Sequence, residues 1–261
     1  MRWQSLVVQA ISDGVSLARM PFAARQGLRI LAYHTVGSSA YGDYLGLNTI
    51  SIERFCEHVD ILADMLTAPL MPLEIPQDEL RIAITFDDGY ADNLYVAAPL
   101  LAERKIPFTV FVTSNFVREQ MDGFLSPSEL KQLAQSPGAT IGAHSRSHCN
   151  LTQCGKEELR AELEDSKHYL EDLIGLPVTS LAYPYGATNM RVRDAAQCAG
   201  YEIGTCSRFD INRVGRDALT LNRCVILCDD SPRVIRQKLQ GDWDWYRLRS
   251  ADPLCIKEPD A

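Results

Sequence analysis

The stretch Arg81-Ile-Ala-Ile-Thr-Phe-Asp-Asp-Gly-Tyr90 decides the fold of this chain, because an apolar run ends there in two adjacent acids and a glycine. Its first six residues predict a buried β-strand, and the apolar spacing from Ala91 to Arg104 predicts a helix after the turn. A strand followed directly by a helix is the repeating unit of a parallel α/β sheet. Sites gather at the carboxyl ends of such strands, so the two acids are the first candidates for chemistry.

Short apolar runs and helix-length periodic stretches alternate along the rest of the chain in the same way. Pro99 should kink or split the helix that follows the two acids. Ser51 and Ser126 are the expected caps of two further helices. The expected helices cover 51–66, the stretch from 127 onward and 156–173, and the expected strands cover 28–34, 81–86, 107–113, 140–144, 180–183, 202–206 and 219–227. Seven parallel strands can nearly close a barrel, so the expected fold class is α/β.

Composition and charge exclude some classes of protein and make some partners unexpected. The 261 residues are 46% apolar and 23% charged, which is ordinary for a globular protein and excludes disordered and fibrous architectures. We expect a single domain over 1–261, with an N-terminal helical extension over 1–26 and a frayed tail over 250–261. The 26 basic and 34 acidic residues give a net charge of -8, so nucleic acid is not an expected partner.

The cysteines and the N-terminus bear on the compartment. Eight cysteines form no Cys-X-X-Cys pair, so we expect reduced thiols. Polar and charged residues interrupt the first 20 positions, which disfavours a signal peptide and a stable membrane insertion. A cytoplasmic location is therefore expected. Apolar residues between Ser5 and Met20 fall near helical spacing, and we expect them to pack on the domain or on a sister subunit of a homo-oligomer.

Acids and histidines at strand ends predict a metal site. Asp87 and Asp88 repel each other unless a cation or a proton relieves them, although they could instead cap the next helix. His144 and His148 directly follow a strand, and a spacing of four can direct two imidazoles to one point on a helical turn. Alone, that pair could equally be turn or surface chemistry. Together, the four residues form a mixed nitrogen and oxygen set that suits a catalytic divalent ion.

A third segment, Ala182-Tyr183-Pro184-Tyr185-Gly186, ends an expected strand in a turn whose backbone amides could donate to an oxyanion, with an ordinary loop as the alternative. The order TFDDGY, then HSRSH, then YPYG resembles the polysaccharide deacetylase family, the NodB-homology carbohydrate esterases. The resemblance covers about residues 28–245. It implies a distorted (β/α) barrel of about seven parallel strands that uses one divalent metal ion, commonly zinc, to remove acyl groups from N-acylated sugars.

The resemblance also implies a role for each motif residue. By match to the first motif, Asp87 would be the general base and Asp88 a metal ligand. By match to the second, His144 and His148 would complete the ligand set. By match to the third, the backbone N–H of Tyr185 would hold the oxyanion formed when water, activated by the metal, attacks the amide. A metal that brings the pKa of its bound water toward about 7 beside a free carboxylate is consistent with this division.

One departure from the family's usual motifs concerns the partner of the base. The third motif often reads Arg-X-Pro-Tyr, but Ala182 stands two residues before Pro184, so the arginine that usually orients the base is missing. Arg223 is the candidate replacement, with a structural arginine as the alternative. Arg146 is a weaker candidate.

A second departure concerns the general acid. The family's last motif usually supplies a histidine, but the corresponding stretch 225–230 contains none. His34, at the end of the first expected strand, is the candidate acid, with a structural hydrogen-bonding role as the alternative. His58 and His168 lie within expected amphipathic helices and should face solvent.

These residues predict a metal-dependent hydrolase that removes an N-acyl group, above all acetyl, from an amino sugar in a glycan or a glycan precursor during polysaccharide biosynthesis. The first alternative is a deformylase or another amide C–N hydrolase on the same metal site. The second is a catalytically weak carbohydrate-binding protein, because the usual arginine and the last histidine are absent. The intact set of Asp87, Asp88, His144 and His148 disfavours this second alternative, since a binding protein has little use for a base beside a metal ligand.

Overall fold

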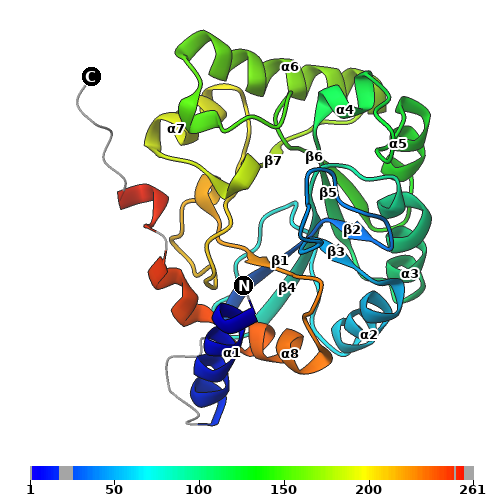
Figure 1. Ribbon diagram of the computed structural model, residues 1–261. Helices are drawn as coiled ribbons and strands as arrows, with labels where there is room; N and C mark the ends of the chain where they lie inside the picture. The colour runs from blue at the N-terminus through cyan, green and yellow to red at the C-terminus, as the bar shows by residue number, and fades with distance from the viewer. Residues whose placement is uncertain (1, 18–25, 250, 256–261) are drawn as a thin grey trace.

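A computed structural model describes residues 2–17, 26–249 and 251–255, and its centre is one curled parallel sheet (Figure 1). The strand order is β8-β7-β6-β5-β4-β1-β9, so each of the seven predicted runs contributes one strand. The strands are β1 (Gly27–Tyr33), β4 (Leu80–Phe86), β5 (Phe108–Val112), β6 (Ala139–Ala143), β7 (Ser180–Ala182), β8 (Ile203–Thr205) and β9 (Cys224–Val225). A separate parallel pair, β2 (Thr35–Val36) and β3 (Thr49–Ile50), extends from the end of β1. The predicted α/β class is confirmed.

The sheet curls until its two edges nearly meet. The Leu221 N–H donates to the carbonyl of Gly204 in β8, and the Cys206 N–H donates to the Leu221 carbonyl, both at 2.8 Å. Three residues later, Cys224 pairs with Leu31 of β1. The segment 221–225 therefore joins the two edges and confirms the expected distorted barrel. The prediction of one strand over 219–227 was too long, because only Cys224–Val225 pairs as a strand within it.

Helices cover the outside of the sheet (Figure 1). Ser51 caps α2 by accepting the Arg54 N–H, and Ser126 forms a capping box with Glu129 at the start of α5, both as predicted. Pro99 lies in the first turn of α3, after a π-helical turn over Asn93–Ala97, so the predicted split occurs. The α-helices are α1 (Arg2–Leu17), α2 (Ile52–Ala63), α3 (Ala98–Glu103), α4 (Ser114–Arg118), α5 (Pro127–Ala134), α6 (Lys156–Ile174), α7 (Met190–Cys198) and α8 (Pro232–Gln240).

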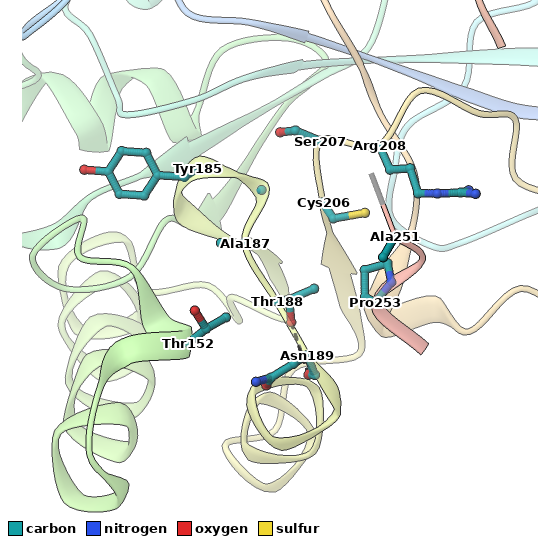
Figure 2. A pocket seen from close by; sticks show the side chains of 11 residues that line it. Thr152, Tyr185, Ala187, Thr188, Asn189, Cys206, Ser207, Arg208, Ala251 and Pro253 are labelled. Carbon is teal, nitrogen blue, oxygen red and sulfur yellow. Dashed lines mark hydrogen bonds between the residues drawn. The ribbon is translucent and has the colours of Figure 1, made fainter. Parts of the chain in front are cut away.

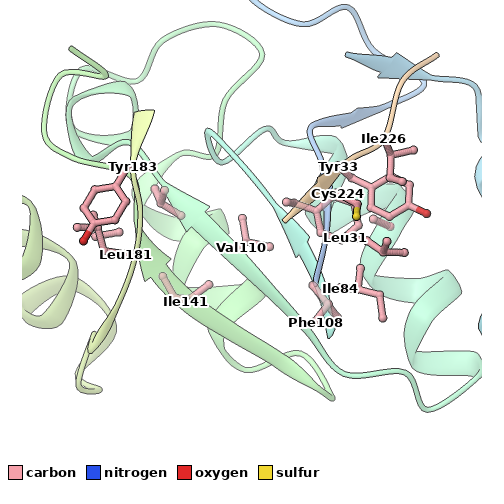
Figure 3. Close-up of a cluster of buried hydrophobic side chains, with 14 of the residues drawn as sticks. Leu31, Tyr33, Ile84, Phe108, Val110, Ile141, Leu181, Tyr183, Cys224 and Ile226 are labelled. Carbon is pink, nitrogen blue, oxygen red and sulfur yellow. The ribbon is translucent and has the colours of Figure 1, made fainter. Parts of the chain in front are cut away.

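Alternation along the strands sorts side chains between two apolar clusters. The larger cluster lies between the sheet and the helices and includes Leu31 and Ile84 (Figure 3). The smaller one includes Ile30 and Ala83, which point the other way, into the barrel. A Cβ on Gly142 of β6 would lie 2.4 Å from the Phe111 ring, which shows how tightly the barrel interior is filled. Residues that continue the inward alternation past the strand ends therefore face the barrel mouth.

The N-terminal helix docks through its polar side. The Gln9 amide donates to Gln237 of α8 at 2.9 Å, and Ser12 accepts from the Trp245 indole N–H at 3.1 Å. Val7 and Ile11 are exposed, so the expected packing of the apolar side on the domain is wrong within this chain. Residues 18–25 of the expected extension, and 250 and 256–261 of the expected tail, lie outside the described residues. Among the described helices, none has the length and apolar character needed to cross a bilayer.

His58 is buried, so the prediction that it faces solvent is wrong. Its side chain is fully buried, with Nδ1 3.1 Å from the Tyr33 hydroxyl and Nε2 2.8 Å from the Asp230 carbonyl. Helix α8 and the segment before it cover the side of α2 that the sequence pattern left for water. His168 on α6 is exposed, as predicted.

This burial gives a pH-dependent stability. Burial lowers the pKa of His58 below its ordinary value of 6.5, whereas the unfolded chain takes up the proton near that value. The unfolded state therefore binds more protons as the pH falls below about 6.5, and folding stability falls with it. We expect His58→Gln to show a smaller drop in Tm between pH 7.5 and 5.5 than the unsubstituted protein, although its Tm at pH 7.5 is lower.

His168→Gln is the matched control, because that imidazole is exposed on α6. Thermal unfolding of the three proteins across this pH range checks the expectation. Equal slopes for His58→Gln and His168→Gln would contradict it.

Candidate metal centre and active site

Three side chains from two strand ends converge at the mouth of the barrel. Asp88 follows β4, while His144 and His148 follow β6. The Asp88 Oδ1 atom lies 3.4 Å from His144 Nε2 and 3.2 Å from His148 Nε2, and the three atoms lie within 4.8 Å of one another. Asp88 and His144 are buried, and His148 is partly exposed. One oxygen and two nitrogen donors thus face a common point with an open side.

These residues fit a divalent cation. The buried Asp88 Oδ1 atom accepts no hydrogen bond from the described residues, although two imidazole nitrogens face it. His144 Nδ1 lies 2.8 Å from the Ala182 carbonyl, which fixes this nitrogen as the donor and leaves the Nε2 lone pair directed toward Asp88. A bound cation would supply the partner that both the Asp88 carboxylate oxygen and the oriented His144 lone pair call for.

The electrostatics of the trio agree with this fit. Burial lowers the pKa of His144 to about 4, which keeps its imidazole neutral and able to act as a ligand. Burial also lowers the pKa of His148, but the Asp88 carboxylate outweighs it and leaves that pKa above 6.5. Burial raises the pKa of Asp88, yet the two histidines that face its carboxylate hold that pKa well below its ordinary range. Asp88 is therefore a carboxylate and His144 a neutral imidazole, and these are the forms in which both can bind a cation.

Unusual backbone conformations build this geometry. Asp88, Ser145, His148 and Tyr185 have φ between 60° and 73°, in the left-handed region, and all four lie in the three motifs. Such conformations cost of order 1–3 kcal/mol each for residues other than glycine and cluster at functional sites. The expected helical turn over 144–148 is wrong, because this segment is an irregular loop in which left-handed residues bring the two imidazoles together.

Glu162 holds that loop, a role the sequence analysis missed. This buried residue of α6 accepts the backbone N–H groups of Arg146 and Ser147 at 3.0 and 2.9 Å, and the Ser147 hydroxyl at 2.7 Å. Arg146 also pairs with Glu162 and with Asp165, so it is not the partner of the candidate base. No spacing in the sequence links Glu162 to the HSRSH segment, since only the fold brings α6 over it.

Asp87 lies beside the trio without belonging to it. Its carboxylate accepts two hydrogen bonds from the Arg223 guanidinium, at 2.6 and 2.7 Å, and both side chains are buried. Burial raises the pKa of Asp87, but Arg223 and nearby imidazoles, His34 among them, outweigh it and hold that pKa below its ordinary value. Arg223 thus lies where a substitute for the missing motif arginine was predicted, and it reaches Asp87 from the position before β9, which is separated from β4 by β1 alone.

His34 and Tyr185 complete the predicted set at the mouth. His34 follows β1 and is partly buried, and within the described part of the chain its Nδ1 atom has no hydrogen-bond partner. Tyr185 follows β7 with its side chain 69% exposed, and its ring centroid lies 4.9 Å from that of His148. Its left-handed φ turns the backbone sharply at the metal trio.

A pocket with a volume of about 470 Å³ opens beside Tyr185 (Figure 2). Figure 2 shows the loop that carries Tyr185 on one side and the segment Cys206–Arg208 on the other. The lining residues are Thr152, Tyr185, Gly186, Ala187, Thr188, Asn189, Cys206, Ser207, Arg208, Ala251 and Pro253. None of the three candidate ligands lines this pocket, but Tyr185 does, and its ring contacts His148. The pocket therefore adjoins the candidate metal centre and has room for parts of a substrate away from the reacting bond.

The thiols near the motifs take no part in this geometry. All eight cysteines are free, and Cys149, directly after His148, has its Sγ atom 3.3 Å from that of Cys154. Burial raises the pKa of both of these thiols. Cys228 packs near residue Leu47, where its N–H donates to the Leu47 carbonyl at 2.8 Å. The expected reduced, unreactive thiols agree with these environments.

Known sequences resemble this chain over the part that holds the motifs. A family model described as polysaccharide deacetylase matches residues 74–204, half of the chain. YxkH of Bacillus subtilis, whose name refers to polysaccharide deacetylases, is 29% identical over 187 residues, covering 68% of this chain and 63% of that protein. A peptidoglycan-N-acetylglucosamine deacetylase of Bacillus cereus is 32% identical over 131 residues, covering 49% and 57%. The match thus spans about three fifths of the length of these relatives.

Solved structures resemble it in fold. The deacetylase PplD of Streptococcus pyogenes, solved in complex with acetate, superposes with a TM-score of 0.72 at 23% identity, over 83% of this chain and 99% of that one. IcaB of Ammonifex degensii superposes with a TM-score of 0.69 at 26% identity, over 82% and 97%. These likenesses confirm the predicted NodB-type barrel. With the family match over the motifs, they show that this chain belongs to the polysaccharide deacetylase family.

Proposed function

We propose that this protein is a metal-dependent hydrolase that removes the acetyl group from an N-acetylated amino sugar in a glycan or a glycan precursor. One observation carries the proposal: a candidate cation-binding trio of Asp88, His144 and His148 lies beside Asp87, a second acid, which is buried and which Arg223 holds outside the trio. The family to which the chain belongs, and relatives named for deacetylation of peptidoglycan and chitooligosaccharides, support the substrate class. We propose zinc as the ion, since two histidines and one carboxylate suit it.

The chain's own residues divide the work of amide hydrolysis. A divalent ion bound by the trio would act as a Lewis acid toward water and the amide oxygen. Asp87 accepts the proton of the attacking water, and Arg223 keeps both carboxylate oxygens in place while it does so. The backbone N–H of Tyr185 donates to the amide oxygen as negative charge develops there, a contribution of about 3 kcal/mol for a well-placed donor.

His34 is the proposed proton donor to the leaving amine. Its Nδ1 atom is buried and has no hydrogen-bond partner among the described residues, so it has a hydrogen bond to offer once a substrate reaches it. We expect His34→Gln to lower kcat by about 10²–10⁴-fold, the range that general acid catalysis contributes, with full metal content. Metal analysis and steady-state kinetics check this, with His168→Gln as the exposed control. A kcat within twofold of the unsubstituted enzyme would place the acid elsewhere.

The function is tested by measuring acetate and free amine released from N-acetylglucosamine oligomers. We expect release that stops on treatment with a chelator and returns on addition of Zn²⁺. His148→Ala, which removes one partly exposed ligand, should bind Zn²⁺ more weakly and lose the release. Full release by chelated protein would overturn the metal-dependent mechanism. Release of formate from N-formyl sugars, with no acetate from acetylated ones, would support the deformylase alternative instead.

The carbohydrate-binding alternative loses one of its two supports. It rested on the missing arginine of the third motif, yet Arg223 presents a guanidinium to Asp87 from another strand. Glycan binding that is independent of metal, without release of acyl groups from any amino sugar, is the outcome that would favour it.

A further inference from the structure

The loop 37–48, between β2 and β3, exposes large apolar side chains beside the candidate site. Tyr41 is 67% exposed, Tyr44 is 98% exposed and Leu45 is 57% exposed. Single exposed apolar residues are ordinary, but several on one loop next to a site indicate a surface that contacts something.

Tyr41 is the member of this loop that the fold holds in place. Its backbone N–H donates to the Tyr90 hydroxyl at 2.8 Å. Its ring centroid lies 6.1 Å from that of Phe116 and 6.1 Å from that of Phe124, in edge-on arrangements. Tyr90 stacks on Phe124 with ring centroids 4.6 Å apart. The backbone and the ring of Tyr41 therefore both contact one aromatic group, formed by Tyr90, Phe116 and Phe124. The Tyr41 ring is therefore both exposed and preorganised.

This aromatic group leads to the metal trio. The Phe116 ring centroid lies 6.2 Å from that of His148, and the exposed Tyr185 ring lies 4.9 Å from the same imidazole. Two exposed tyrosine rings, Tyr41 and Tyr185, are thus connected through aromatic contacts to one candidate metal ligand.

We propose that Tyr41 is a substrate-binding residue whose ring packs against the sugar unit next to the one that loses its acetyl group. This inference rests on the proposed function. A pyranose has apolar C–H faces and polar edges. The apolar ring of a tyrosine can pack against such a face while its hydroxyl forms hydrogen bonds at the edge. A ring already held by Phe116 and Phe124 loses little entropy on binding.

The charge of the loop favours a glycan over an anionic bilayer. Residues 37–48 contain Asp43 and no lysine or arginine. Surface attachment to anionic lipid draws on clustered cations beside the apolar residues, which this loop lacks.

The test compares Tyr41→Ala with Tyr44→Ala, a matched control on the same loop. We expect Tyr41→Ala to raise KM for an N-acetylglucosamine tetramer about tenfold, which is about 1.4 kcal/mol, with a much smaller change in kcat. The loss should shrink on the monosaccharide, which lacks the neighbouring unit, and Tyr41→Trp should restore binding. Tyr44→Ala should keep the unsubstituted KM, because its side chain projects into solvent.

Direct binding separates failure of this inference from failure of the proposed function. Calorimetric titration of the tetramer into Asp87→Asn needs no turnover, and adding Tyr41→Ala to that variant should weaken binding about tenfold. That result supports the inference even where no amino sugar is deacetylated. Equal affinities with and without Tyr41→Ala would overturn it. An equal loss for Tyr44→Ala, or a Tyr44-dependent binding to phosphatidylglycerol vesicles, would also overturn it, because the loop would then act as a general apolar contact.

Discussion

Asp87→Asn is expected to bind the metal ion at full stoichiometry and to lose about 10²–10⁴-fold in kcat. The carboxamide is isosteric with the carboxylate and keeps one oxygen to accept from Arg223, but it cannot take a proton from water. Because Asp87 contributes no atom to the ligand trio, the change should leave ion binding intact. Acetate release measures kcat, and elemental analysis of the purified protein measures the metal content.

The matched control is Asp88→Asn, a substitution of the same kind one residue along the chain. It removes the negative charge that two imidazoles face, so metal and activity should be lost together. A fully active Asp87→Asn protein would remove Asp87 from the mechanism. Loss of the metal ion from Asp87→Asn would show that the two acids do not divide the roles of base and ligand.

Local sequence patterns predicted seven parallel strands that could nearly close a barrel, and the family resemblance implied the distorted barrel itself. Each short apolar run became a strand. Strands of a parallel sheet are covered on both faces, so they are recognisable in the sequence as nearly continuous apolar runs. Ser51 and Ser126 cap their helices through side-chain oxygens that act within three residues. The strand-end placement of Asp88 and His144 follows from the same patterns, since parallel strands bring their carboxyl ends to one edge.

The remaining features depend on contacts between distant segments. The helical turn predicted for HSRSH failed, because Ser145 and His148 adopt left-handed conformations that Glu162 of α6 supports from outside the motif. His58 is buried because α8 covers it, which no periodicity within α2 could reveal. The edge-on contact of Tyr41 with Phe116 likewise joins positions 75 residues apart in sequence, at a separation where spacing carries no signal.

The role of Arg223 could be predicted from the sequence only in part. Its position could be proposed by resemblance, but its pairing with Asp87 required the parallel pairing of β9 with β1, which places Arg223 two strands from the end of β4. Its guanidinium also contacts the Thr85 hydroxyl at 3.3 Å and lies over the Phe111 ring, so the whole side chain fills the barrel interior. A buried charge in such a place is tolerated only with its partner present.

Arg223→Met is therefore expected to destabilise the protein by about 3–5 kcal/mol, because it leaves the Asp87 carboxylate buried without its counter-charge. Methionine fills much of the same volume, so the loss reports on charge more than on a cavity. The double variant Arg223→Met/Asp87→Asn should be more stable than the sum of the single changes predicts, by about 2–3 kcal/mol of coupling. Urea unfolding of the four chelator-treated proteins measures this cycle.

Arg29→Met separates stability from positioning of the base. Arg29 is equally buried and pairs in the same two-bond manner with Asp244, at 2.7 and 3.0 Å, but on the helix-facing side of β1. It should cost similar stability, yet the folded, metal-loaded fraction should keep its kcat. Arg223→Met should lose kcat in its folded fraction as well, since the carboxylate loses the two donors that fix its oxygens. Additive stabilities in the cycle, or equal kcat for both arginine variants, would leave Arg223 as a structural residue and Asp87 without a positioning partner.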